Sequence, residues 1–272
     1  MLFRSKLARV LRRLGALDKA EECGNDALSC ARERHDREAV MDGLLTLSTL
    51  AWSRGDLDRC ESLAQEGLVL ASGPQNGRAR ASLLLSLTSV QANRGQLASA
   101  SSGLMEASTI LKDLRDKPLR ALALVNLAEV SLGQGEVLAA WERAEESLGL
   151  AREVGHKLVE TAVHRVKGML LAQVGQQEAA EKELKTALAT AQSLGVPQET
   201  CAVAFHLARV SVELGEMVDA EKYLEIATVA VASGDPEHYH IAVDMERALL
   251  HALAGRHADR KSTRLNSSHL VI

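Results

Sequence analysis

The stretch RASLLLSLTSVQANR-G-QLASASSGLMEASTILKDL, residues 80–114, decides the fold of this chain. Its part before Gly95 carries an apolar stripe at helical spacing over about four turns. Gly95 can adopt a positive φ and end that helix. The alanine-rich part after Gly95 has the pattern of a second helix. The stretch is therefore interpreted as a helical hairpin.

The central glycine of this hairpin recurs every 40 residues along the whole chain. We call these residues the turn glycines and count positions from them: Gly15, Gly55, Gly95, Gly135, Gly175, Gly215 and Gly255. Such a fixed period is the signature of a repeat architecture. Each repeat is therefore expected to be one helical hairpin, with a first helix before the turn glycine and a second helix after it.

Other positions keep the same register. The eighth position before the turn glycine is leucine in most repeats, but it is Lys167 and Arg247 in two of them. The seventh position before it is small, and so are the fifth and twelfth after it, as in Ala100 and Ala107. Small side chains let neighbouring helix backbones approach closely. These positions are therefore predicted to lie where helices cross.

Composition agrees with an all-helical chain. Of 272 residues only 2% are aromatic, which argues against a β-sandwich or a β-barrel. The four prolines lie between the second helix of one repeat and the first helix of the next, where a helix boundary tolerates them. No linker interrupts the array. The sequence therefore predicts one continuous α-solenoid.

The pattern resembles the tetratricopeptide repeat (TPR) family. The residues that carry the resemblance are Leu-Ala at 7–8 and 207–208, the turn glycines, and Ala-x-x-x-Leu-x-x-Ala at 180–187 and 220–227. The resemblance covers about six and a half repeats, and it implies a right-handed α-solenoid of antiparallel helix hairpins. Two features depart from the common form: the repeat is longer than the usual ~34 residues, and Leu, Ala or Ser replaces most of the large aromatic residues.

Repeats of this length are similar to segments of bacterial signalling and transcription regulators, such as the maltose-activator type and kinases with attached repeats. This narrower resemblance implies a non-catalytic, cytoplasmic interaction scaffold within a larger regulator, which binds a peptide or protein in its concave groove. The alternative is a domain that senses a ligand or a signal peptide and switches an attached kinase, ATPase or DNA-binding domain.

Both ends of the chain resemble translated sequencing adapter. DRKSTRLNSSH (259–269) matches one reading frame of a common adapter, and LFRS (2–5) matches the opposite adapter end. We therefore expect an adapter-derived start at 1–5, a solenoid truncated at both ends at 6–258, and an adapter-derived disordered tail at 259–272. The truncated ends of such a solenoid could self-associate.

Several classes of function lack support in the sequence. The net charge of −4 gives no general attraction for nucleic acid, and no apolar run has the ~18 residues of a membrane span. No phosphate-binding loop or hydrolase motif is present. Cys23, Cys30, Cys60 and Cys201 lack metal-ligand spacing and are interpreted as apolar core residues. His238 and His240 are read as part of a solvated loop. No catalytic residue, cofactor or metal is expected.

The candidate binding surface lies on the first helices, which line the concave face of such a solenoid. The tenth, sixth and third positions before the turn glycine include Arg, Met and aromatic groups that are typical anchors for a peptide or a partner helix, and Asn126 and Glu129 lie beside them. The candidate residues are Trp52, Asn126, Glu129, Arg165, Met169, Phe205, Arg209 and Met245. The alternative for Phe205 and Trp52 is packing against neighbouring helices. Trp141 falls on a second helix and is assigned to packing.

Overall fold

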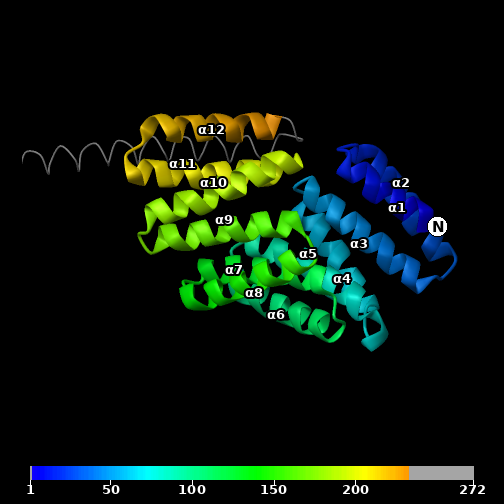
Figure 1. Ribbon diagram of the computed structural model, residues 1–272. Helices are drawn as coiled ribbons and strands as arrows, with labels where there is room; N and C mark the ends of the chain where they lie inside the picture. Colours follow the sequence, from blue (N-terminus) through cyan, green and yellow to red (C-terminus); the bar gives the residue numbers. More distant parts are fainter. Residues whose placement is uncertain (1, 233–272) are drawn as a thin grey trace, which may run out of the picture. The chain divides into compact units, whose positions relative to one another are not determined.

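The computed structural model describes residues 2–232, and these fold into twelve α-helices and one short 3-10 turn (Figure 1). The first helices of the repeats are α1 (Leu2–Arg13), α3 (Arg37–Ser53), α5 (Gly77–Asn93), α7 (Lys117–Gly133), α9 (Lys157–Gln173) and α11 (Pro197–Leu214). The second helices are α2 (Leu17–Glu33), α4 (Leu57–Leu70), α6 (Leu97–Asp113), α8 (Val137–Glu153), α10 (Gln177–Leu194) and α12 (Met217–Ala232). The predicted helical solenoid is confirmed. Residues 2–5, expected to be adapter-derived, form the start of α1, while Met245, Gly255 and residues 259–272 lie outside the described part.

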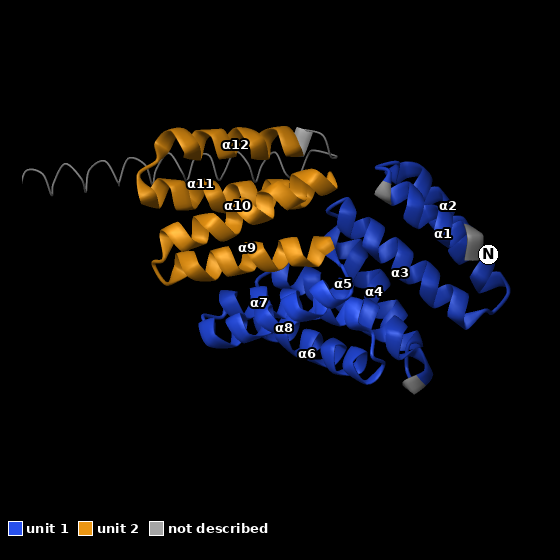
Figure 2. Ribbon diagram, in the orientation of Figure 1, with its two compact units in different colours: residues 1–156 blue, residues 157–272 orange. Residues whose placement is uncertain are grey.

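The chain divides into two compact units, which Figure 2 shows in different colours. Unit 1 spans residues 1–156 and holds α1 to α8; unit 2 begins at Lys157 and holds α9 to α12. Within each unit, every first helix packs against the second helix of its own repeat. It is these local pairings that make each 40-residue repeat a structural element.

The turn glycines have the backbone conformation that their position requires. Gly135 adopts a φ of 80°, and the φ angles of all other turn glycines in the described part of the chain are also positive. The turn is closed by two hydrogen bonds: the Gly135 amide donates to the Leu132 carbonyl at 3.0 Å, and the Glu136 amide donates to the Ser131 carbonyl at 2.9 Å. A left-handed residue after a helix satisfies its last carbonyls in this way.

A second set of left-handed residues lies twenty positions after the turn glycines, where one repeat leads into the next. Glycine occupies this place at 155 and 195, but His35 has a φ of 53° and Arg115 a φ of 56°. Non-glycine residues in this region carry a steric cost between Cβ and the backbone. The prolines lie near these turns, as the sequence predicts, but the register of the left-handed residues was not predicted.

Substitutions at a glycine turn and at a non-glycine left-handed turn should have opposite effects on stability. Gly135→Ala should lower the free energy of unfolding by about 1 kcal/mol, since an added Cβ meets no atom within 4 Å and only the left-handed φ opposes it. Arg115→Gly should raise it by a smaller amount, about 0.5 kcal/mol, because relief of the strain exceeds the gain in unfolded-chain entropy. Urea unfolding followed by circular dichroism measures both; a stabilised Gly135→Ala would contradict the turn geometry.

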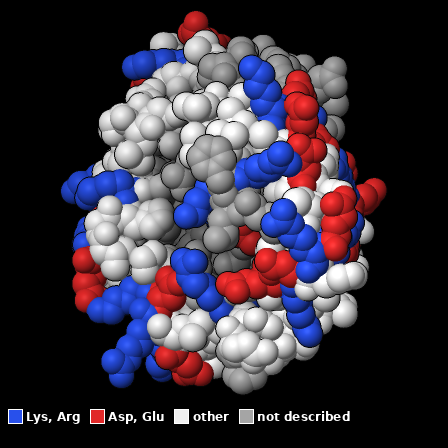
Figure 3. All heavy atoms as spheres, turned by 90° about the vertical axis from the view of Figure 1, so that its right-hand side faces the viewer, with Lys and Arg blue, Asp and Glu red and all other residues white. Residues whose placement is uncertain are grey.

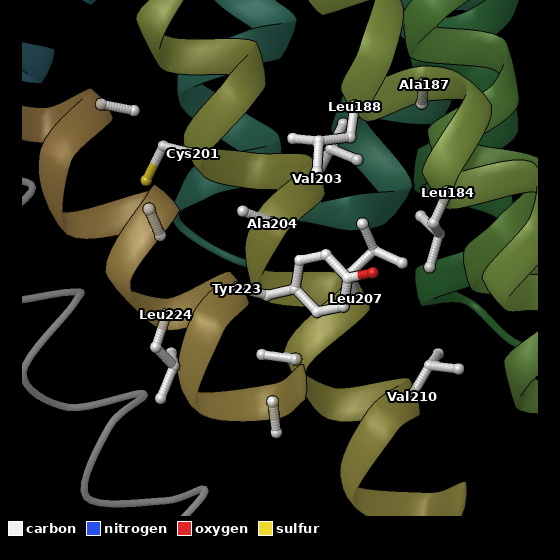
Figure 4. Packing of buried hydrophobic residues seen from close by; sticks show 14 of the residues in the cluster. Leu184, Ala187, Leu188, Cys201, Val203, Ala204, Leu207, Val210, Tyr223 and Leu224 are labelled. Carbon is white, nitrogen blue, oxygen red and sulfur yellow. The ribbon is translucent and has the colours of Figure 1, made fainter. Parts of the chain in front are cut away.

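The core lies where the sequence placed the small residues. Ala100, Ala140 and Ala180, each five after a turn glycine, are fully buried, as are Ala107 and Ala187, twelve after it. In unit 2 these alanines join larger side chains, and Figure 4 shows Leu184, Leu207 and Tyr223 among them. The prediction that small side chains mark the helix crossings is confirmed.

Candidate functional site

The first helices form the inner side of the array in each unit. In unit 1, α1 contacts α3, α3 contacts α5 and α5 contacts α7; in unit 2, α9 contacts α11. Within the described residues, no two second helices of one unit approach each other in this way. Helices that crowd together lie on the inside of the bend, and the second helices therefore spread on the outside.

In unit 2 the structure brings four of the candidate residues onto two adjacent helices. Arg165 and Met169 lie on α9, whereas Phe205 and Arg209 lie on α11. Arg209 is exposed and Met169 is partly exposed, so both side chains reach the surface. Phe205 is partly buried and packs against the hydrophobic core of unit 2. This contact corresponds to the packing alternative for Phe205.

Arg165 is held in a largely buried ion pair. Its Nε lies 2.9 Å from Oε1 of Glu199 on α11, and the two side chains are only 11% and 16% exposed. Its Nη1 also lies 3.7 Å from the Met169 sulfur. Leu85 and Val125 occupy the same tenth position in unit 1, and both are buried. This position therefore points toward a neighbouring helix, while the sixth position, that of Met169 and Arg209, points to the surface.

In unit 1 the candidate residues are spread over separate helices. Trp52 lies on α3 with 40% of its surface exposed, whereas Asn126 and Glu129 lie one turn apart on α7 and are partly buried. Contacts run from α3 to α5 and from α5 to α7. Trp52 therefore does not adjoin Asn126, and the pair on α7 forms a separate part of the inner side.

A cluster of ionisable residues in unit 2 was missed from the sequence. His164 Nδ1 lies 2.6 Å from Oε2 of Glu183 on α10, and Lys167 Nζ lies 3.8 Å from the other oxygen of that carboxylate. Both basic side chains are less than a fifth exposed. The signal was present, because Lys167 stands where most repeats have leucine. The acidic partner on the next helix could not be found by counting positions along the first helices.

Unit 1 carries a repeated ion-pair arrangement between the residue that follows a first helix and the preceding second helix. Arg54 Nη2 lies 2.6 Å from Asp18 and 3.2 Å from Glu21 of the preceding second helix. Forty residues on, Arg94 pairs with Asp58 and Glu61 in the same way. On the face that Figure 3 shows, basic and acidic side chains are mixed with uncharged ones.

The potential metal ligands and the thiols of the described residues bear on the chemistry that this part of the chain can carry out. Residues 2–232 contain no group of three or more His, Cys, Asp or Glu side chains that could hold a metal ion. Burial raises the pKa of the Cys60 and Cys201 thiols to about 11, which opposes thiolate formation. Both thiols are buried, whereas Cys23 and Cys30 on α2 are partly exposed. None of the helices in this part of the chain combines the length and apolar character needed to cross a membrane.

Comparison with known proteins identifies the fold. No family model matches the sequence, and no curated protein matches it. Among solved structures, the apo form of RapI superposes with a TM-score of 0.72 at 14% identity, covering 84% of this chain and 81% of that one. Aspartyl phosphate phosphatase F from Bacillus subtilis gives 0.71 at 12%, covering 84% and 58%. The Rap conjugation gene regulator of plasmid pLS20, in complex with the Phr* peptide, gives 0.69 at 14%, covering 88% and 66%. At these identities the likeness shows a TPR-like helical solenoid.

Proposed function

We propose that this chain is a non-catalytic, cytoplasmic interaction scaffold, the repeat segment of a larger bacterial signal-transduction or transcription regulator, which binds a peptide or a protein segment on the inner side of its first helices. The observation that supports the proposal is the fold: the Rap conjugation gene regulator of plasmid pLS20, which has a similar helical arrangement, forms a complex with the Phr* peptide. The inner side also presents side chains of the types that anchor peptides.

The strongest part of the proposed surface lies in unit 2. Met169 and Arg209 occupy the same register on adjacent helices, and both reach the surface. The side chains that precede them by one turn are held in place: Phe205 packs into the core, and Arg165 is fixed by its ion pair with Glu199. A thioether and a guanidinium on a rigid base suit a peptide that offers one apolar side chain and one carboxylate or backbone carbonyl. Trp52, Asn126, Glu129 and Met245 belong to the same proposal.

The proposal predicts a defined loss of binding. Short linear peptides selected from a phage-displayed library on the immobilised chain serve as the probe, and fluorescence anisotropy measures their affinity. Phe205→Ala with Arg209→Ala should weaken binding by about tenfold or more, because it removes the exposed Arg209 guanidinium and the core side chain that supports this surface. The matched control is Lys222→Ala with Val229→Ala on α12, which also removes one cation and one apolar side chain, both exposed.

Thermal unfolding distinguishes lost binding from lost folding. Phe205→Ala removes core contacts and should lower the melting temperature moderately, so binding is measured well below the transition. The proposal would be refuted if the double variant Phe205→Ala, Arg209→Ala bound every selected peptide as tightly as the wild-type chain does. The same loss in the Lys222 and Val229 variant would move the binding surface to the second helices.

The alternative function is a sensor that switches an attached effector domain when it binds a small ligand or a signal peptide. The peptide-bound Rap regulator favours the signal-peptide form of this alternative. A thermal-shift screen against small molecules separates the small-ligand form, since a ligand that binds only the folded chain raises its melting temperature by mass action. If a small molecule raises the melting temperature and the phage-display selection yields no binding peptide, the result would support a small-ligand sensor in place of the scaffold.

A further inference from the structure

Arginine side chains on the first helices are, as a rule, paired within the chain. Arg78 Nε lies 2.7 Å from Oδ2 of Asp116, and Arg165 Nε lies 2.9 Å from Oε1 of Glu199. Carboxylates also pair with Arg4, Arg9, Arg80 and Arg120, whereas Arg12 and Arg37 donate to a serine hydroxyl and to a main-chain carbonyl. The fold therefore supplies these guanidinium groups with acceptors of its own.

Arg209 on α11 differs from these arginines. Its side chain is exposed, and within residues 2–232 no hydrogen bond or ion pair engages it. Glu213, which lies one turn further along α11, does not pair with it. A guanidinium group presents several N–H donors in a planar fork that matches the two oxygens of a carboxylate. Arg209 therefore has donors available for an acceptor that the described chain does not provide.

Arg9 shows which acceptor an arginine at this place takes. Arg9 and Arg209 both stand six residues before a turn glycine, within the same sequence Leu-Ala-Arg-Val at 7–10 and 207–210. Nη1 of Arg9 lies 3.4 Å from Oδ1 of Asp42 on the next first helix, α3. In the repeat after Arg209, the residue at the place of Asp42 is Ala242. The sequence therefore lacks, at that place, the carboxylate that Arg9 has.

The surface beside Arg209 is apolar. Met169 stands at the same register on α9, which contacts α11, and its side chain is partly exposed. Ala172, one turn after Met169, and Phe205, one turn before Arg209, are partly buried and pack against the core of unit 2. The nearest other cation in this register, Arg165, is already neutralised by Glu199. One cation with available donors thus adjoins a firm apolar surface.

We propose that Arg209 binds an acidic side chain of the partner peptide, so that the inner side of unit 2 selects segments in which Asp or Glu adjoins an aliphatic residue. The guanidinium takes the carboxylate, and Met169 contacts the aliphatic side chain. Because it names the ligand of the same inner side, this proposal rests on the proposed function.

Matched peptides test the proposal on the full chain. The probe is a peptide selected by phage display, synthesised with a fluorophore and an amidated C-terminus so that its side chains are its one source of carboxylate. A second version carries Gln or Asn in place of each Glu or Asp. The amide version should bind about tenfold or more weakly, since Arg209 would lose a charge-assisted hydrogen bond. The affinity of the acidic version should fall as salt is added.

Exchange of the charges locates the effect at Arg209. Arg209→Glu should weaken binding of the acidic peptide by about tenfold or more, because two carboxylates then face each other. A peptide with Lys in place of the acidic residue should bind this variant more tightly than it binds the wild-type chain. The matched control is Lys182→Glu on α10, which makes the same change of charge at an exposed residue of a second helix. Circular dichroism should show that both variants keep their helical content.

The outcomes separate the acidic partner from the scaffold itself. If the selection yields no binding peptide, the proposed function fails and the acidic partner fails with it. If peptides bind but the acidic and amide versions bind equally, or Arg209→Glu leaves the affinity unchanged, the scaffold stands and the acidic partner is overturned. An equal loss in the Lys182→Glu chain would also overturn it, because the effect would then come from overall charge.

Discussion

Gly168→Ala is expected to lower the free energy of unfolding by about 2 kcal/mol, because it overfills a packed helix crossing. The added Cβ would lie 2.5 Å from Cγ of Leu184 on the neighbouring helix α10 and 3.3 Å from the Ala180 carbonyl oxygen. Leu184 is fully buried and cannot swing into solvent. In the Gly168→Ala variant, α9 and α10 must therefore move apart.

Gly149→Ala is the matched control and is expected to have the opposite sign. Gly149 lies inside α8, and a Cβ there meets no atom within 4 Å. The substitution should stabilise the chain by up to about 1 kcal/mol through higher helix propensity. Urea unfolding followed by circular dichroism compares both variants with the wild type. Stabilisation by Gly168→Ala would mean that α9 and α10 do not approach as closely as described.

Glu199→Leu is expected to cost about 2–4 kcal/mol, because it removes the carboxylate that faces a largely buried guanidinium. Glu199 accepts a hydrogen bond from Nε of Arg165 at 2.9 Å. In unit 1 the residues at the equivalent positions are Leu85 and Leu119, which are both apolar. The double variant Arg165→Leu with Glu199→Leu should therefore recover most of the loss and unfold within about 1 kcal/mol of the wild type.

The same variants show whether Arg165 contributes to the stability of the fold, to peptide binding, or to both. A double-mutant cycle on thermal unfolding gives the coupling between Arg165 and Glu199, and the single variant Arg165→Leu completes it. Additive effects of the two substitutions would show that the pair does not act as a unit. Peptide affinity of the stable double variant then reports whether Arg165 itself contacts the partner or only supports Met169.

Much of the fold could be predicted because one backbone requirement recurs. A helical hairpin needs a left-handed residue at its turn, and the turn glycines mark that place in each repeat between residues 2 and 232. Small residues marked the helix crossings for a similar reason, since only they fit between close backbones. The turns between repeats were less visible, because Arg115 and His35 take the left-handed conformation without being glycine.

The candidate site could be predicted only in part. Position along a first helix correctly placed Arg165, Met169, Phe205 and Arg209 on adjacent helices of unit 2. It could not show that Arg165 turns toward Glu199, because that partner lies 34 residues away on another helix. Nor could it foresee Glu183 between His164 and Lys167. Contacts between helices, unlike periodicity along one helix, depend on pairs of distant residues.

Photo-crosslinking of a selected peptide to the chain tests the central claim, that the first helices carry the binding surface. A benzophenone group is placed on the peptide, and mass spectrometry locates the residues to which it attaches after illumination. Crosslinks are expected within α9 and α11, at Met169 and around Arg209. Crosslinks confined to the exposed sides of α10 and α12 would contradict it.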